Sequence, residues 1–178
     1  MKATGIVRRI DELGRVVIPK EIRRTMRIRE GDPLEIFTDR DGEVIFKKYS
    51  PIGELGDFAA QICDSLHRST DAIAAVCDRD SIIAVSGASK RDFIDKRVSP
   101  ALERVMESRG SVRYDGTEPI HVIDGDERYY VSVASPILSE GDILGCVIFV
   151  SQNASAGSDI EFKLAQTVAS FLGKQMES

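Results

Sequence analysis

Residues 11–25 read DELGRVVIPKEIRRT, and this stretch decides the fold expected for the first part of the chain. Leu13-Gly14 is a turn signal, because glycine adopts positive φ without steric cost. Residues 15–18 predict a short β-strand, which Pro19 ends because proline cannot donate a ladder hydrogen bond. Residues 20–27 predict a short helix. The stretch therefore predicts a turn, a strand and a helix in immediate succession.

The stretch belongs to a small β-rich domain expected over residues 1–50. Residues 5–10 predict a strand ahead of the first turn, and residues 34–38 and 43–49 predict a hairpin closed by Asp41-Gly42. A domain of this size, without disulfides or metal ligands, rarely buries enough apolar surface to be stable alone. We therefore expect an obligate dimer in which strands of two chains share one core.

Residues 51–178 predict a larger domain of helices and strands. Ser50-Pro51 and Ser99-Pro100 are helix starts, with serine as N-cap and proline as first helical residue. Ser158 to Glu161 is a capping box that opens the final helix. That helix has a wider apolar surface than a sheet alone requires, which predicts packing on a second helix, either residues 52–66 or their counterpart in a partner chain. The expected strands are 71–77, 81–85, segments around Val112 and His121, 129–134 and 143–150.

Charge is unevenly distributed along the 178 residues, whose formal net charge is -5. Residues 1–50 hold 12 Lys and Arg against 9 Asp and Glu (net +3), and residues 51–178 hold 12 against 20 (net -8). This asymmetry predicts an anionic partner for the basic part. No apolar run approaches the ~20 residues that span a bilayer, and the start lacks the apolar core of a signal peptide. We therefore expect a cytoplasmic protein with no membrane partner.

The sequence offers little for catalysis. Cys63, Cys77 and Cys146 are far apart among apolar neighbours, which indicates buried free thiols. His67 and His121 lack the spacing of metal ligands. No P-loop, GxSxG or HExxH motif is present. We therefore expect no enzyme activity, no catalytic residue and no metal site.

Basic residues near the N-terminus form the candidate binding surface. A solvated charged face is the alternative, but the strand–turn–helix order favours a shared surface. Neighbouring strand residues point to opposite faces, so either Arg8 or Arg9 can join Arg15, Arg23 and Arg24, and a two-fold dimer would double this set into a stripe. Guanidinium groups suit phosphate oxygens and guanine edges, which favours double-stranded DNA as the partner. The candidates are Arg8, Arg9, Arg15, Lys20, Arg23 and Arg24.

Residues 4–28, TGIVRRIDELGRVVIPKEIRRTMRI, with the hairpin end IFKKY (45–49), resemble the DNA-binding domain of the AbrB family of bacterial transition-state regulators. The resemblance implies an intertwined swapped-hairpin β-barrel made by two chains. It also implies A/T-rich sites that are read largely by shape and flexibility. It favours Arg8 over Arg9 as the strand arginine on the shared surface. The DNA contacts that the resemblance implies are Arg8, Arg15, Arg23 and Arg24, with Lys2 and Arg9 as helpers.

Residues 135–175, SPILSEGDILGCVIFVSQNASAGSDIEFKLAQTVASFLGKQ, are similar to the end of a GAF domain, an antiparallel sheet flanked by helices. Taken together, the two parts give an α+β chain that resembles a regulator from spore-forming bacteria, which activates or represses sporulation genes. The resemblance implies that the second domain senses a small molecule or joins dimers into a tetramer. The ligand is unassigned, because the cyclic-nucleotide signature is absent; the candidate pocket walls are Ser86–Ser89 and Asp124–Tyr130.

Two other functions fit parts of the sequence. An antitoxin-like swapped-hairpin protein would also bind DNA, but such proteins end in a short disordered tail, whereas the second half here is long and apolar. A GAF-type thiol reductase would act on methionine sulfoxide through accessible cysteines of low pKa. The apolar surroundings of the three cysteines argue against it.

Overall fold

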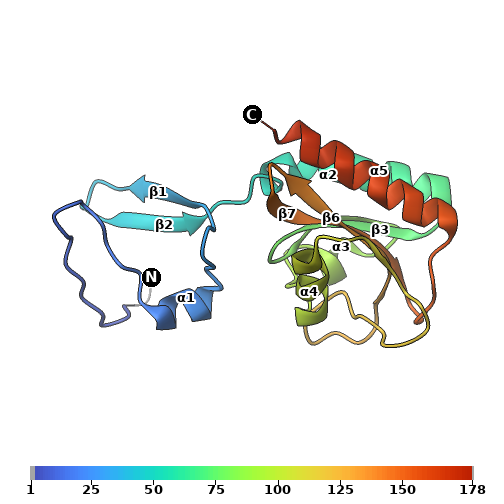
Figure 1. The fold of residues 1–178 in the computed structure, drawn as a ribbon, viewed down its shortest axis with the longest axis horizontal. Helices are drawn as coiled ribbons and strands as arrows, with labels where there is room; N and C mark the ends of the chain where they lie inside the picture. Colours follow the sequence, from blue (N-terminus) through green and yellow to red (C-terminus); the bar gives the residue numbers. More distant parts are fainter. Residues whose placement is uncertain (1–2, 178) are drawn as a thin grey trace. The chain divides into compact units, whose positions relative to one another are not determined.

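The computed structural model describes residues 3–177, and the chain divides into two compact units, Met1–Tyr49 and Ser50–Ser178. The first unit contains one short helix and one β-hairpin (Figure 1). The helix is α1 (Lys20–Met26), and the hairpin joins β1 (Leu34–Thr38) to β2 (Val44–Lys48) in antiparallel register. The helix and the second hairpin predicted from the sequence are thus confirmed.

Two loops of the first unit share one turn geometry. In residues 11–15, Oδ1 of Asp11 accepts hydrogen bonds from the backbone N–H groups two and four residues later, at 2.9 and 2.8 Å. In residues 39–43, Oδ1 of Asp39 does the same at 3.0 and 2.9 Å. The fourth residue of each loop is a glycine, with φ of +75° at Gly14 and +86° at Gly42. Aspartate caps the turn in both loops, and glycine supplies the left-handed residue that the reversal requires.

The strands expected at residues 5–10 and 15–18 are not formed within the single chain. The backbone bond from Asp11 N to Arg15 O, 3.0 Å, closes the loop, but no ladder continues from it. A strand needs a neighbour to accept and donate its hydrogen bonds, and these two segments do not supply that neighbour to each other.

The first unit has almost no core of its own. Among residues 3–49, only Pro19 is buried. Twelve large apolar side chains are exposed, with Val7 at 87% and Val17 at 70%. Both clusters of buried apolar residues lie in the second unit. The exposed set is Ile6, Val7, Ile10, Leu13, Val16, Val17, Met26, Ile36, Phe37, Val44, Phe46 and Tyr49.

The second unit is one antiparallel sheet covered on both faces (Figure 1). Its strand order is β4-β3-β7-β6-β5. Helices α2 and α5 cover one face, and the short helices α3 and α4 with their loops cover the other. The elements are a 3-10 turn η1 (Gly53–Leu55), α2 (Gly56–Thr70), β3 (Ile73–Asp78), β4 (Ile82–Ser86), α3 (Lys90–Phe93), α4 (Pro100–Ser108), β5 (Val112–Arg113), β6 (Tyr130–Ser139), β7 (Asp142–Ser151) and α5 (Asp159–Gln175).

Alternation along the central strands divides the buried residues between two cores. On β3, Ala75 and Cys77 face the α3/α4 side, whereas Ala74 and Val76 face the α2/α5 side. Strand β7 alternates in the same way, and its Cys146 lies opposite Cys77 in the register. Both faces of these strands are therefore apolar, which explains their continuous apolar sequence.

Several expected boundaries are confirmed. Ser99 caps α4, and Ser158 with Glu161 forms the capping box of α5. As its wide apolar surface predicted, α5 packs on the sheet and also contacts α2, where the rings of Phe58 and Phe171 are 6.2 Å apart.

Other expectations were wrong. Ser50 does not start a long helix, because its Oγ and carbonyl both bind Gly53 N in a 3-10 turn, and α2 begins only at Gly56. The two glycines weaken the helix where the sequence pattern placed its start. His121 makes one isolated bridge instead of a strand, β6 continues to Ser139, and α3 was not predicted.

We expect Gly173→Ala to destabilise the second unit. A methyl group placed on Gly173 would lie 2.0 Å from the carbonyl oxygen of Leu138, so α5 would have to move off β6. The expected loss is about 1–3 kcal/mol in the free energy of unfolding, measured by urea denaturation of the full chain. Gly56→Ala is the matched control in a helix, because no atom lies within 4 Å of its added methyl group. Equal stabilities of the two variants would contradict the close approach of α5 to the sheet.

Candidate nucleic-acid interface

The Asp11 loop presents Arg15 on the surface of the first unit. The side chain of Arg15 is 71% exposed, and its Nε donates to Oδ2 of Asp11 at 2.8 Å. Hydrogen bonds from the backbone and then the side chain of Arg15 lower the pKa of Asp11, so its carboxylate stays charged at neutral pH. The turn and the arginine are thus held by the same carboxylate.

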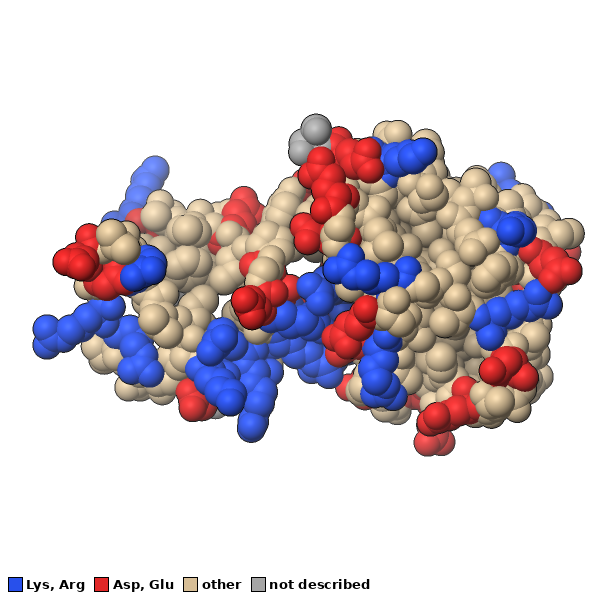
Figure 2. Space-filling view, viewed as in Figure 1, with Lys and Arg blue, Asp and Glu red and all other residues tan. Residues whose placement is uncertain are grey.

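Helix α1 presents Arg23 and Arg24 in its last turn, and both are exposed. The helix ends where Arg27 adopts a left-handed conformation, and Ile28 N donates to the carbonyl of Arg23 at 2.8 Å. Cations at a helix C-terminus are favoured by the carbonyl dipoles. Lys20, at the first position of α1, is exposed as well. Figure 2 shows Lys and Arg side chains gathered over α1.

The remaining candidates lie on the extended N-terminal segment. Arg8 and Arg9 are both exposed, and neither belongs to a helix or strand of the single chain. Lys2 lies outside the described residues. All the arginines predicted to contact DNA therefore belong to one unit and are exposed to solvent.

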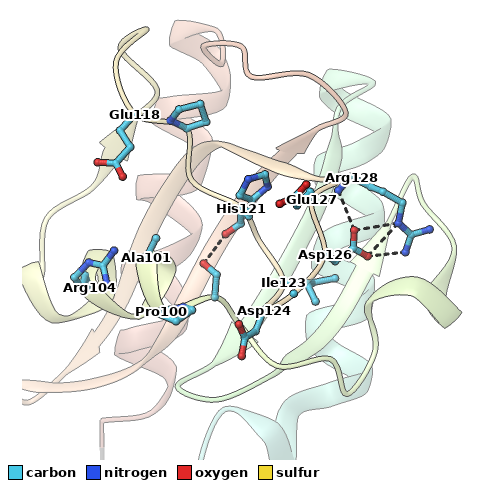
Figure 3. Close-up of a pocket in the computed structure, with 13 residues that line it drawn as sticks. Pro100, Ala101, Arg104, Glu118, His121, Ile123, Asp124, Asp126, Glu127 and Arg128 are labelled. Atoms are coloured by element: carbon cyan, nitrogen blue, oxygen red, sulfur yellow. Dashed lines mark hydrogen bonds and ion pairs between the residues drawn. The ribbon is translucent and has the colours of Figure 1, made fainter.

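The second unit contains a cavity of about 760 Å³ between the start of α4 and residues 118–128 (Figure 3). Of the two expected pocket walls, residues 124–128 line it, but Ser86–Ser89 does not. That loop packs on α2 instead, where Ser86 Oγ donates to Asp64 at 2.6 Å. The Nδ1 atom of His121, a lining residue, is buried and has no hydrogen-bond partner among residues 3–177. The lining combines charged side chains of both signs with apolar ones.

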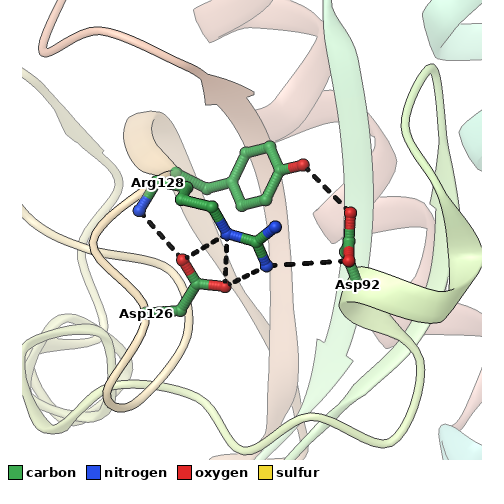
Figure 4. A network of polar contacts seen from close by, with 4 residues as sticks. Asp92, Asp126 and Arg128 are labelled. Carbon is green, nitrogen blue, oxygen red and sulfur yellow. Dashed lines mark hydrogen bonds and ion pairs between the residues drawn. The ribbon is translucent and has the colours of Figure 1, made fainter.

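A polar clamp fixes one wall of this cavity (Figure 4). Arg128 donates through Nε and Nη2 to the carboxylate of Asp126, with a shortest distance of 2.6 Å, and its Nη2 lies 3.6 Å from Asp92. Tyr129 donates to Asp92 at 3.4 Å, and its ring packs against Phe93 with centroids 4.6 Å apart. The hydrogen bond from the Arg128 side chain is the main reason that the pKa of Asp126 is lowered. The clamp ties α3 to the loop before β6.

The three cysteines are buried and unsuited to thiol catalysis. Burial raises the pKa of Cys63 to about 12, and it also raises the pKa values of Cys77 and Cys146 well above the ordinary value of a thiol. A reductase needs thiolates near neutral pH, whereas these thiols stay protonated. His67 has a structural contact of its own, since its Nδ1 is hydrogen-bonded to the carbonyl of Ala72 at 2.8 Å.

Two features of the described chain bear on partners other than DNA. No group of three or more His, Cys, Asp or Glu side chains within residues 3–177 is arranged to hold a metal ion. In the same range, no helix has the length and apolar character required to cross a membrane.

Sequence reasoning missed Asp11 and the clamp. The predicted turn was Leu13-Gly14 alone, although an aspartate four residues before an arginine, with a glycine between them, could have indicated the pairing. The clamp joins residues 92, 126, 128 and 129, and no local pattern predicts a contact across such a separation.

Both units match known protein families. Residues 54–177 match the model of the stage V sporulation protein T C-terminal, transcription factor family, and residues 7–53 match that of antidote-toxin recognition MazE, bacterial antitoxin. Stage V sporulation protein T of Bacillus subtilis (strain 168) is 55% identical over 178 residues, which cover 99% of each chain. Transition state regulatory protein AbrB of the same organism is 65% identical over 51 residues, 29% of this chain and 52% of that protein.

A solved structure supports the fold of the second unit. The GAF domain of an Acinetobacter phosphoenolpyruvate-protein phosphotransferase superposes with a TM-score of 0.55 at 12% identity, over 68% of this chain and 81% of that one. The predicted α+β class, an AbrB-type hairpin unit followed by a GAF-like antiparallel sheet with flanking helices, is confirmed. The chain belongs to the stage V sporulation protein T family of transcription factors.

Proposed function

We propose that this protein binds double-stranded DNA through residues 1–50 and regulates sporulation genes as an activator or a repressor. The observation that carries the proposal is the set of exposed arginines on the unit that is similar to AbrB. The proposed contacts are Arg8, Arg15, Arg23 and Arg24, assisted by Arg9 and Lys2. DNA in the bacterial cytoplasm is the partner that the positive charge of this part fits.

We further propose that residues 1–50 form an intertwined dimer. The support is physical: twelve large apolar side chains are exposed, and Pro19 is the single buried residue among residues 3–49. Such a set needs cover from outside the chain, and strands of a second copy would supply both the missing ladders and the missing core. Dimerisation would also double the arginine surface.

The proposed role of residues 51–178 is oligomerisation, together with sensing of a small molecule. The α2/α5 face exposes Phe58 (37%), Phe171 (46%) and Ile160 (66%), which supports contact with another copy and hence a tetramer. The cavity beside α4, with its charged and apolar lining, would hold the ligand. The antitoxin alternative is supported only over residues 7–53, and nothing over residues 54–177 favours it.

Removal of two arginines tests DNA binding. We expect the Arg23→Ala, Arg24→Ala double variant to lose most of its affinity for an A/T-rich duplex in fluorescence anisotropy, with unchanged circular dichroism. If a dimer neutralises about eight phosphates, log K for the unaltered protein falls against log salt with a slope of roughly -7. Arg40→Ala, an exposed arginine in the β1–β2 loop, is the control and should bind normally. A slope near zero would contradict the arginine surface.

The fragment of residues 1–50 tests the dimer. It should sediment as a dimer, because its apolar side chains have no cover within one chain. Analytical ultracentrifugation at several concentrations, with circular dichroism at each, measures both association and folding. A fragment that is folded and monomeric at every concentration would rule out the intertwined dimer.

Substitution on the α2/α5 face tests the tetramer. In the full chain, Phe58→Ser with Phe171→Ser should convert tetramers to dimers in sedimentation, because the two exposed rings would then no longer pack in a contact between copies. Urea stability of the second unit should change little, since neither ring is buried. Persistence of the tetramer would show that another surface joins the dimers.

A further inference from the structure

Arg15 differs from the other proposed DNA contacts in having a partner for its side chain. Its Nε is held by Asp11, whereas the side chains of Arg8, Arg9, Arg23 and Arg24 have no partner in the part of the chain that the structure describes. A free arginine side chain must be ordered when it binds, and that ordering reduces affinity and precision. Arg15 thus already has a bonded partner within its own chain.

The two oxygens of Asp11 have separate tasks. Oδ1 accepts the backbone N–H groups of Leu13 and Arg15 and so forms the turn. Among residues 3–177, Oδ2 accepts a hydrogen bond from Nε of Arg15 alone. The Nη1 and Nη2 atoms of that guanidinium are therefore left to bind something else.

The second turn of the same unit shows that these tasks are separable. Asp39 makes the same two Oδ1 bonds, and its loop closes through the same two backbone bonds, Asp39 N to Glu43 O at 3.2 Å and Gly42 N to Asp39 O at 3.4 Å. The position that corresponds to Arg15 is occupied by Glu43, which cannot donate to the aspartate. The turn thus forms without the Oδ2 contact.

In the clamp of the second unit, an Asp–Arg pair engages the terminal nitrogen of the arginine as well as its Nε. Asp126 engages both Nε and Nη2 of Arg128, and Asp92 lies 3.6 Å from the same Nη2. That guanidinium is committed to internal contacts (Figure 4). Asp11 engages Nε alone, so its arginine is oriented but retains both terminal nitrogens.

We propose that Asp11 is a positioning residue for DNA recognition, whose carboxylate aims the Arg15 guanidinium at the duplex. The proposal rests on the DNA-binding function proposed above. A guanidinium fixed through Nε presents a planar pair of donors, which suits a base edge or two phosphate oxygens. The negative charge of Asp11 also repels phosphate, so the residue weakens general attraction while it sharpens the geometry of one contact.

A double-mutant cycle tests this coupling. The unaltered full chain, Asp11→Asn, Arg15→Gln and the double variant are titrated with one A/T-rich duplex by fluorescence anisotropy. Asparagine keeps the Oδ1 acceptor for the turn, but its amide cannot accept from Nε. In the Arg15→Gln background, Asp11→Asn should tighten binding, because a negative charge is removed. With Arg15 present, the ratio of the DNA affinity of the Asp11→Asn variant to that of its parent should be lower by about threefold or more than in the Arg15→Gln background. This is the size expected for directly coupled residues.

Asp39→Asn is the matched control. It removes the same charge from the same kind of turn, but no arginine depends on it. Its effect on DNA affinity should be equal with and without Arg15. Equal effects of Asp11→Asn in the two backgrounds, or a larger gain with Arg15 present, would overturn the proposal, since the second result would mean that Asp11 withholds Arg15 from DNA.

A measurement without DNA separates this proposal from the proposed function. In ¹⁵N NMR spectra of the full chain, the Nε–Hε signal of Arg15 should be protected from solvent exchange, lost in Asp11→Asn and kept in Asp39→Asn. An unprotected signal in the unaltered protein would overturn the positioning role whether or not DNA is bound. Failure of Arg15→Gln and of the Arg23, Arg24 double variant to weaken DNA binding would instead contradict the proposed function.

Discussion

Burial of one antiparallel sheet on both faces is the constraint on which the second unit depends. Alternate residues of β3 and β7 enter two separate cores, so neither strand can shift by one residue without exchanging its whole set of neighbours. Gly145 on β7 and Gly173 on α5 fit this packing closely, because an added methyl group at either would meet a backbone carbonyl oxygen at 1.9 or 2.0 Å. These two glycines allow the close approach of β7 to β3 and of α5 to β6.

Local chemistry explains which parts of the fold could be predicted. Serine caps before proline or an acidic residue correctly predict the helix starts at residues 99 and 158, and the Asp-Gly pair at residues 41–42 correctly predicts the hairpin. The start expected at Ser50 failed because Gly53 and Gly56 interrupt the helix that the apolar spacing indicated. Helix α3 has four residues, too few for periodicity to reveal it.

The candidate site was predictable in composition but not in geometry. Clustered arginines beside an expected strand and a short helix single out Arg15, Arg23 and Arg24 as candidates from charge alone. What the sequence does not display is that one of them is held in place, because the contact with Asp11 depends on the reversal at Gly14. The pattern of charges therefore indicates the candidate surface, and the turn determines which of its side chains has a partner within the chain. Long-range contacts such as that of Arg128 with Asp92 lie beyond any local pattern.

The unequal burial in the two units has a consequence for calorimetry. The heat-capacity change of unfolding follows the apolar surface that unfolding exposes. Nearly all of that surface within one chain belongs to residues 50–177, so a thermogram of a single chain would report mainly the loss of the GAF-like sheet. Melting of residues 3–49 will add little heat of its own within the single chain. Any heat of unfolding from the first unit must come from surface that it buries in the proposed dimer, so one midpoint temperature will not describe both units.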